Sequence, residues 1–420
     1  MIADPTTSLS AKFPMSSHSQ VLFVSRYFWP EIIGSAPFSA DIAKWLTRHG
    51  RSTTVVSGLP YYPEPEVFPA YRDGRCRREM IDGITVERLP IGAPTNGSAA
   101  SRIFNEAGFL LRGLAALLTG RIDRHRLVLA LCPSILSVAL GVAARQRGGF
   151  CVAIVHDIQS GLAEKLGMVG GGGIARLMRA CERTILNRTD LVIVLSPEMK
   201  DQLLRIGVSA PIEVVPLWVD TDHIMPTEPV LGHSVKVLYS GNLGRKQGLG
   251  QVVEMAERLS TSRPDIEIIL RGNGSQGGEI SAELARRQLP NIRLTELEPH
   301  EALTTALAVG DIHLVPQNPK AAAFAVPSKV FNIMAVGRPF VATALPGSAL
   351  WQLQRDSGAF LCVPPDEPIP FAEAVVRLAD DAHLRRELGR RGRAFVELNH
   401  AKPRILGDLL GRLDALTARD

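Results

Sequence analysis

The sequence predicts an α/β protein with two doubly wound domains, each a parallel sheet covered by helices on both faces. Three observations support this prediction. The chain has 420 residues, which is long enough for two hydrophobic cores. An apolar strand, a loop with glycine, a helix and a second strand follow one another from residue 21. The same order returns from residue 235, as expected if each half opens with a βαβ unit.

The first half opens with a short apolar run. Val21–Ser25 reads VLFVS, which is typical of a strand buried on both faces. A loop with Pro30, Gly34 and Pro37 follows, and Thr53–Ser57 is predicted as the second strand. Between them one helical face is apolar, with Phe38, Ile42, Ala43, Trp45 and Leu46. Further strands are predicted at 127–131, 151–155, 191–195 and 212–215.

The second half repeats this order. Val235–Ser240 is predicted as a strand, Gly241, Gly244 and Gly248 form the loop, and Ile266–Leu270 is the next strand. The helix between them has an apolar face made of Val252, Val253, Ala256 and Leu259. Further strands are predicted at 292–295, 312–315, 339–343 and 359–363.

A segment with prolines and little periodicity separates the two halves, and we interpret it as a linker. The predicted organisation is a tail at 1–19, a first domain at 20–219, a linker at 220–234, a second domain at 235–397 and a last helical segment at 398–420. Doubly wound sheets bind ligands at the carboxyl ends of their strands. We therefore expect the active site in a cleft between the two domains.

Composition excludes several classes of protein. With 45% hydrophobic and 21% charged residues, the chain is not a disordered one. The net charge of +5 favours anionic partners without pointing to nucleic acid, which we do not expect as a partner. The five cysteines form no CxxC pair, which argues against a cysteine zinc site and for a reducing compartment. Residues 1–19 lack the apolar core of a signal peptide.

One uncharged stretch, Leu127–Ala144, approaches the length of a membrane span. Because Pro133 and Ser134 interrupt it, a buried strand, a turn and a helix explain it as well, and we favour that reading. Residues 102–126 combine leucines with arginines at both ends. Such a segment is either a core helix or a helix on an anionic membrane surface, and we favour membrane contact slightly.

Three segments of the second half suit an anion. The loop Gly241–Gly248 carries Arg245 and Lys246, and is either a phosphate site or a tight turn with solvated cations. Gly272–Gly277 matches GxGxxG, with Glu296 at the expected acidic distance. We interpret it as a phosphate-facing or structural loop, since no helix is evident after Gly277. A helix near Pro327–Gly337 begins with Ser328 and Lys329, and Asn332 projects from it.

Two further residue patterns bear on catalysis and on metal binding. His156 follows the predicted strand 151–155, where a histidine serves equally well as an acid, a base, a hydrogen-bond donor or a structural residue. Asp220 and Asp222 form a DxD pattern, which we assign to a turn or a helix cap and not to a metal. No Walker A, HExxH or GxSxG sequence occurs, which argues against kinases, zinc proteases and serine hydrolases.

These motifs together carry a family resemblance that covers nearly the whole chain after residue 20. The chain resembles the family-4 retaining glycosyltransferases of the GT-B fold, which have two Rossmann-like domains facing across a cleft. It is most similar to the branch typified by the colanic-acid biosynthesis fucosyltransferase. The segments concerned are PEIIGSAP (30–37), GLPYYPEP (58–65), VHDIQ (155–159), LYSGNLGRKQGL (238–249), RGNG (271–274) and VPSKVFNIMAVGRP (326–339).

The resemblance implies an intracellular hexosyltransferase that needs neither metal nor cofactor. Its donor, a nucleoside-diphosphate sugar, would bind mainly the second domain, and its acceptor the first. His156 matches the histidine near the transferred sugar, and Lys246 matches the lysine that neutralises the diphosphate. The residues expected to bind the donor are Gly34, Gly241, Asn242, Arg245, Gly272, Asn273, Gly274, Ser328, Lys329 and Asn332.

The chain departs from the family pattern at three positions. Phe324 and Asn332 stand where most members carry two glutamates, and Asn242 stands where an arginine usually follows the first glycine. These departures concern the contacts to the ribose and hexose hydroxyls of the donor. The final helix of this fold often crosses back to the first domain, which would suit 398–420.

We therefore expect a retaining, metal-independent glycosyltransferase that moves a sugar, fucose being one candidate, to a lipid-linked oligosaccharide. It would serve bacterial exopolysaccharide or surface glycan biosynthesis, at the inner face of the plasma membrane and in the cytoplasm. Two alternatives stay open. One is a nucleotide-sugar epimerase, whose product is an isomer and not a free nucleotide. The other is a non-catalytic membrane-bound scaffold, which Phe324 and Asn332 motivate.

Overall fold

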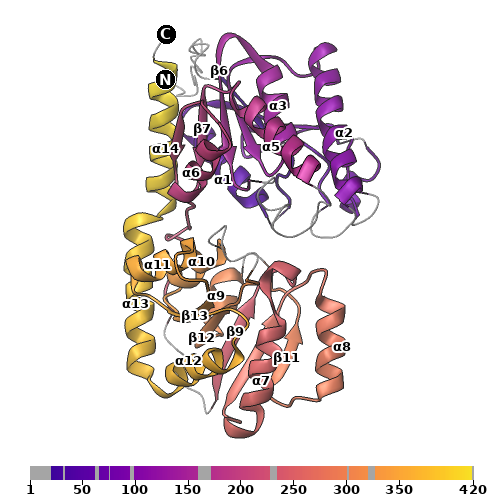
Figure 1. Cartoon of the computed structure of the whole chain (residues 1–420). Helices are drawn as coiled ribbons and strands as arrows, with labels where there is room; N and C mark the ends of the chain where they lie inside the picture. The colour runs from indigo at the N-terminus through magenta and orange to yellow at the C-terminus, as the bar shows by residue number, and fades with distance from the viewer. Residues whose placement is uncertain are drawn as a thin grey trace, which may run out of the picture. The chain divides into compact units, whose positions relative to one another are not determined.

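The computed structural model describes residues 20–31, 34–61, 66–74, 76–94, 99–158, 172–227, 234–299, 302–319 and 327–418. Its strands form two sheets, one of eight strands and one of six. Helices surround each sheet (Figure 1). The predicted fold class, two doubly wound α/β units, is confirmed.

The first sheet is centred on β1, which pairs in parallel with β2 on one side and β5 on the other. Its strand order is β3-β4-β2-β1-β5-β6-β7-β8. The strands are β1 (Gln20–Val24), β2 (Ser52–Ser57), β3 (Arg78–Ile81), β4 (Ile84–Arg88), β5 (His125–Cys132), β6 (Arg145–Val155), β7 (Leu191–Val194) and β8 (Ile212–Val214). The accompanying helices are α1 (Ala36–Arg48), the short η2 (Pro69–Tyr71), α2 (Ala99–Leu118), α3 (Ile135–Ala144), α5 (Gly172–Leu186) and α6 (Pro197–Arg205).

The second sheet is parallel throughout and is centred on β9, which lies between β10 and β12. Its order is β11-β10-β9-β12-β13-β14. The strands are β9 (Val235–Ser240), β10 (Ile266–Arg271), β11 (Ile292–Thr295), β12 (Ile312–Val315), β13 (Phe340–Thr343) and β14 (Leu361–Val363). The helices from here to the chain end are η3 (Arg245–Gln247), α7 (Gly250–Ser262), α8 (Gly277–Arg287), α9 (Leu303–Ala308), α10 (Lys329–Ala335), α11 (Ala349–Ser357), α12 (Pro368–Asp380), α13 (Ala382–Asn399) and α14 (Lys402–Thr417).

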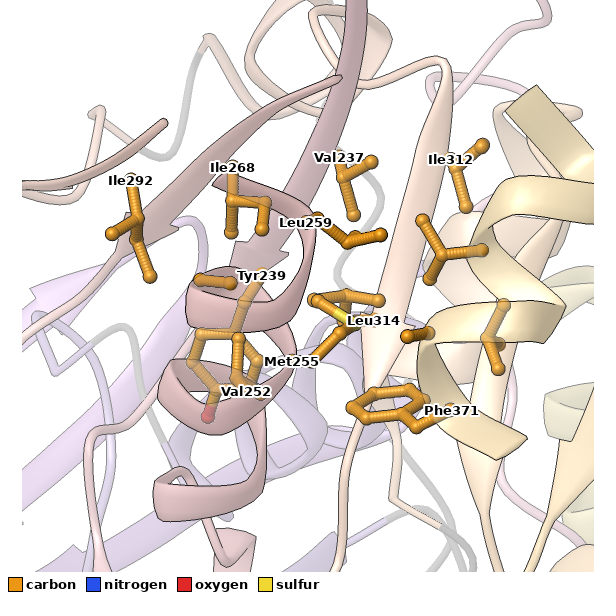
Figure 2. Packing of buried hydrophobic residues seen from close by; sticks show 14 of the residues in the cluster. Val237, Tyr239, Val252, Met255, Leu259, Ile268, Ile292, Ile312, Leu314 and Phe371 are labelled. Carbon is orange, nitrogen blue, oxygen red and sulfur yellow. The ribbon is translucent and has the colours of Figure 1, made fainter. Parts of the chain in front are cut away.

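Both faces of the second sheet bury apolar side chains. On one face Val252, Met255 and Leu259 of α7 pack on strand residues and on Phe371 of α12, as Figure 2 shows. On β13, Val341 belongs to this cluster, whereas its neighbour Phe340 belongs to a second cluster with α10 and α11. Successive side chains of a strand point to opposite faces. Burial on both faces therefore explains why these strands are uninterrupted apolar runs in the sequence.

The structure differs from the prediction at a hairpin that the pattern did not reveal. β3 and β4 pair antiparallel at the edge of the first sheet, joined by Asp82 and Gly83. Both turn residues have positive φ, 50° and 80°, as a two-residue hairpin turn requires. β3 alternates between exposed and half-buried residues and so lacks an apolar run. The Asp-Gly pair was the signal that could have found it.

Two predicted helical features need correction. The segment 102–126 is not one helix, because α2 ends at Leu118 and β5 starts at His125. Gly120, with φ of 68°, stops the helix, so Arg121, Arg124 and Arg126 lie beyond it. Conversely, a helix does begin directly after the GxGxxG segment, since α8 starts at Gly277.

The uncharged stretch Leu127–Ala144 is a strand, a turn and a helix, as predicted. β5 is followed by a turn at Pro133, and the Ser134 hydroxyl accepts a hydrogen bond from the Leu136 N–H at the start of α3. In the part of the chain that the structure describes, no helix has the length and apolarity needed to cross a bilayer.

The residues group into two compact units. One runs to Ile154 and includes Ile185–Val192 and the chain end from Leu413, and the other contains Val155–Thr184 and Ile193–Arg412. Within the first unit Arg51 forms an ion pair with Asp414 of α14. The predicted domain boundaries stay a prediction.

Candidate functional site

The glycine loops of the second unit lie side by side at the carboxyl ends of two neighbouring strands. β9 leads into Gly241 and β10 leads into Gly272. β9 lies between β10 and β12, so the chain reverses the direction in which it adds strands at this point. Open α/β sheets bind their ligands at such switch points.

Backbone hydrogen bonds hold the two loops together. The Gly241 N–H donates to the Arg271 carbonyl at 2.9 Å, and the Leu243 N–H donates to the Asn273 carbonyl at 2.8 Å. The Leu243 carbonyl in turn accepts from the Gln276 N–H at 2.9 Å. Gly241, Asn242, Gly272, Asn273 and Gly274, all predicted to bind the donor, are therefore brought together in one double loop.

The close approach of the loops explains two of the glycines. A Cβ on Gly272 would lie 1.9 Å from the Gly241 carbonyl oxygen, and one on Gly274 would lie 2.5 Å from the Leu243 carbonyl oxygen. No side chain fits at either position, because a backbone atom cannot yield as a flexible side chain can. These two glycines thus allow the loops to approach each other backbone to backbone.

Lys329 brings a cation to this double loop from α10. Its Nζ lies 3.7 Å from the centroid of the Tyr239 ring and 3.0 Å from the point where a Cβ of Gly241 would be. The Nζ is buried and has no hydrogen-bond acceptor among the described residues. Burial lowers the pKa of Lys329 to about 7. Tyr239 is itself fixed, since its hydroxyl donates to the Asn242 carbonyl at 2.6 Å.

Lys246 and Arg245 lie on the 3-10 turn η3, and both are exposed. The turn is tied to the loop after β12, because the Asn318 N–H donates to the Lys246 carbonyl at 2.8 Å. The side chain of Lys246 is thus in solvent beside the glycine loop. Its predicted role at the diphosphate stays a prediction.

The remaining predicted residues of α10 divide between surface and core. Ser328 is exposed and its hydroxyl makes no capping hydrogen bond, and Asn332 is half-buried. Val330, Ile333 and Met334 are buried in the core. Phe324, one of the two positions where family glutamates are replaced, lies outside the described residues.

Two predicted residues belong to loops of the first sheet. Gly34 is exposed in the loop after β1, with a φ of 71° that favours glycine. His156 directly follows β6, and burial lowers its pKa to about 4. The imidazole is therefore neutral at neutral pH and would act there by hydrogen bonding, without a charge.

Sequence reasoning missed a polar cluster at the carboxyl end of β1. Arg26 is 1% exposed, and its Nη2 donates to the Gly92 carbonyl and to Asn105 Oδ1, each at 2.8 Å. Its guanidinium lies within 6 Å of the ring centroids of Tyr27 at 5.4 Å, Tyr61 at 5.5 Å and Phe109 at 5.6 Å. These residues are far apart in the sequence, so only the arginine that ends an apolar strand could have drawn attention to them.

Glu106 adds a carboxyl group to this cluster. Burial raises its pKa, Arg26 lowers it, and the carboxylate accepts a hydrogen bond from Ser134 at the end of β5. The Tyr27 and Tyr61 hydroxyls lie 3.2 Å apart, and burial raises the pKa of both. The first sheet thus carries its own polar cluster at the point where its strand order reverses between β1 and β5.

The DxD pattern has structural partners. Asp220 Oδ1 accepts from the His223 N–H at 3.2 Å, and its Oδ2 lies 3.0 Å from Lys402 Nζ. Across the described ranges, no group of three His, Cys, Asp or Glu side chains could hold a metal ion. Asp220 therefore acts in a turn and an ion pair.

Two known protein families match this chain, one over most of the residues of each sheet. A glycosyl transferase 4-like domain matches residues 34–218, and a glycosyl transferases group 1 domain matches residues 234–381. The colanic acid biosynthesis glycosyl transferase WcaI of Escherichia coli (strain K12) is 29% identical over 364 residues. The match covers 83% of this chain and 89% of that protein.

Solved structures show the same architecture. Sucrose-phosphate synthase from Thermosynechococcus elongatus has a TM-score of 0.77 at 19% identity, covering 96% of this chain and 100% of its own. HepE from Anabaena, solved in complex with UDP-glucose, has a TM-score of 0.67 at 15% identity. The match covers 94% of this chain and 99% of the HepE chain. With two glycosyl transferase domains on two doubly wound sheets, the chain is a glycosyltransferase of the GT-B fold.

Proposed function

We propose that the chain transfers a sugar from a nucleoside-diphosphate sugar to a growing bacterial surface glycan, with retention at the anomeric carbon. The observation that carries the proposal is the double glycine loop at the ends of β9 and β10. Backbone N–H groups in such glycine loops suit the anionic oxygens of a diphosphate. The WcaI match supports a glycan product, and the HepE complex supports a nucleotide-sugar donor.

Charge stabilisation is the chemistry that the site would supply. When the sugar leaves, negative charge develops on the diphosphate. Preorganised donors and cations stabilise it best where water is excluded. Lys246 and the loop Gly241–Gly248 would do this without a metal, and His156 would hydrogen-bond the transferred sugar. The acceptor hydroxyl would attack from the face that the diphosphate leaves, and would give its proton to the departing phosphate oxygen.

A panel of donors tests this proposal. Purified protein would be heated with UDP-glucose, GDP-fucose and other nucleotide sugars in turn. A ligand that binds the native state raises the melting temperature. We expect one donor to do so, and to release free nucleoside diphosphate when acceptor is added. An isomerised donor with no free nucleotide would instead establish an epimerase, and no consumption with any acceptor would favour the scaffold.

Metal independence has its own test. We expect transfer to continue after treatment with EDTA. If EDTA abolishes transfer and magnesium or manganese restores it, the cationic-side-chain mechanism is overturned. Asp220 and Asp222 would then be the candidate metal ligands.

We also propose that α2 binds the anionic inner face of the plasma membrane, where a lipid-linked acceptor would be found. Three large apolar side chains of α2 are exposed at seven-residue spacing, Phe104 at 76%, Leu111 at 65% and Leu118 at 85%. This spacing puts them on one face of the helix. Arg102 and Arg112 on the same helix are exposed too. An apolar stripe with flanking cations is the pattern of interfacial helices.

Vesicle sedimentation tests the membrane proposal. Full-length protein should bind vesicles with phosphatidylglycerol at low salt, and less as salt screens the charges. Phe104→Ser with Leu111→Ser should abolish binding. Leu204→Ser, on a half-exposed leucine of α6, serves as the matched control. Equal vesicle binding by the α2 double variant and the wild type would contradict the proposal that α2 binds the membrane.

A further inference from the structure

We infer that Lys329 is a second cation, besides Lys246, that meets the donor's diphosphate at the end of β9, and that it takes up a proton when the diphosphate binds. This inference rests on the proposed function. Lys329 reaches the loop from α10, whereas Lys246 reaches it from η3. The two lysines therefore approach the same glycine loop from different elements.

The geometry places the ammonium where a phosphate would come. The Lys329 Nζ lies 3.0 Å from the point where a Cβ of Gly241 would be, and that Cβ is missing. Gly241 has a φ of 141°, which side-chain-bearing residues rarely adopt. A glycine at this position thus keeps open the space directly in front of the ammonium.

A structural role does not account for this lysine. Two buried arginines of the unit have acceptors: Arg271 donates to the Ala306 carbonyl at 2.7 Å, and Arg338 donates to the Thr227 carbonyl at 3.0 Å. Lys329 has only the face of Tyr239, and its Nζ is buried with no acceptor in the described part of the chain. A buried charge without a partner is costly, and proteins keep such groups mainly where they act on a ligand.

Among the described residues, no group that acts on Lys329 supplies a negative charge. Tyr239 keeps its proton, since burial raises its pKa. His313 on β12 interacts with Lys329, but burial lowers its pKa to about 3, so it is neutral. Arg271 and Arg338, which interact with the same histidine, are cations. A diphosphate bound at this loop would place an anion beside Lys329 and would favour its protonated form.

The proton has a defined place in the reaction. The bond between the anomeric carbon and the diphosphate oxygen breaks, and its electron pair stays on that oxygen. The acceptor oxygen bonds to the carbon and releases its proton to the diphosphate. The Lys329 ammonium donates a hydrogen bond to the diphosphate throughout and loses its extra proton only when the product leaves.

Titration calorimetry with UDP and GDP tests the inference. Measurements between pH 7.5 and 9.5 avoid the ligand's own titration, since the second phosphate pKa is about 6. In wild-type protein we expect uptake of about one proton and a Kd that rises by up to roughly tenfold per pH unit. Lys329→Met should show no uptake, a flat pH profile and binding weaker by roughly 10- to 100-fold at pH 7.5.

Three further variants make the outcome decisive. Lys329→Arg should bind with a flat pH profile, because a guanidinium does not titrate in this range. Lys246→Ala should keep the proton uptake, and Lys236→Met, at the other end of β9, should behave as the wild type. If Lys329→Met keeps the proton uptake, or Lys246→Ala loses it, the inference is overturned. If neither nucleotide binds wild-type protein, the proposed donor class fails first and the inference with it.

Discussion

The carboxyl ends of β1 and β9 occupy the same topological position in their sheets, but one is lined by side chains and the other by backbone. At β9 two glycine loops meet backbone to backbone, and one lysine faces them. At β1 large side chains fill the space: an arginine surrounded by aromatic rings, two tyrosine hydroxyls and a buried carboxyl group.

The difference shows that one topology can be lined in two ways. An end lined with backbone can present N–H groups to a phosphate. A phosphate is bound through many hydrogen-bond donors and depends little on side-chain shape. An end lined with side chains fixes a particular set of hydroxyl, carboxyl and guanidinium groups instead. The two ends also differ in how they treat charge, because Arg26 has two acceptors and Lys329 has none among the described residues.

The largest effect is expected where backbone meets backbone. In Gly272→Ala the new Cβ would overlap the Gly241 carbonyl oxygen, 1.9 Å away, and would push the two loops apart. We expect transfer to fall by roughly 100-fold or more and the free energy of unfolding to fall by about 3 kcal/mol. Donor-dependent release of nucleotide and urea denaturation measure the two.

Gly278→Ala on α8 is the matched control, because nothing lies within 4 Å of its Cβ. It should leave transfer intact and change stability by no more than about 1 kcal/mol, in the stabilising direction. Comparable losses in the two alanine variants would show that the loops do not depend on their close approach.

The next effect separates two buried arginines of the first unit. Arg88 is 0% exposed and its Nε donates to Glu79 at 2.7 Å, whereas Arg26 has no carboxylate within ion-pair distance in the described residues. Arg88→Met should lower the free energy of unfolding by about 3 kcal/mol, because it leaves a partly buried carboxylate without its cation. Arg26→Met should cost about 1 kcal/mol, the scale of ordinary hydrogen bonds. Urea midpoints compare them, and a larger loss for Arg26→Met would show that the aromatic cluster depends on its charge.

Replacing Lys329 should have a smaller effect on stability, and one of opposite sign. The pKa of Lys329 is about 7 in the folded chain and near 10.4 when unfolded, so between these values the unfolded state binds more protons. Stability then rises with pH in this window, and the cost of the buried charge is full below pH 7. Lys329→Met should therefore stabilise the free protein by about 1 to 2 kcal/mol at pH 7. The gain should vanish toward pH 10, and a gain independent of pH would mean that the ammonium is not the cause.

Much of the fold could be predicted from apolar runs, because strands buried on both faces carry that signal themselves. Val21–Val24 are all 0% exposed, and β9 has the bounds that were predicted. The β3–β4 hairpin could not be found in this way, since an exposed edge strand has no apolar run. Its turn, Asp82-Gly83, carried the only local signal.

The candidate site was predictable in part for the same reason. Strand order makes the loops after β9 and β10 neighbours, so the glycines could be placed together before their contacts were known. The burial of Lys329 could not be predicted, because a lysine at a helix start is ordinarily solvated. Nor could the Arg26 cluster, which joins residues as distant as Tyr61 and Glu106 through folding alone.

The last comparison is between one histidine of each region, and its expected effect is the smallest. His313 is 1% exposed and its Nε2 donates to the Leu307 carbonyl at 3.0 Å, a structural bond, whereas His156 directly follows β6 and is predicted to lie near the transferred sugar. Burial keeps the pKa of His156 near 4, so the ring should stay neutral from pH 5 to 8. Transfer should then show no acid limb in this range, and the proton resonances of the ring should not move. His156→Gln should lower kcat by roughly tenfold, the cost of one neutral hydrogen bond, without changing the shape of the acid side of the profile. An acid limb near pH 6.5 that this variant removes would make His156 a charged catalyst and contradict the neutral role.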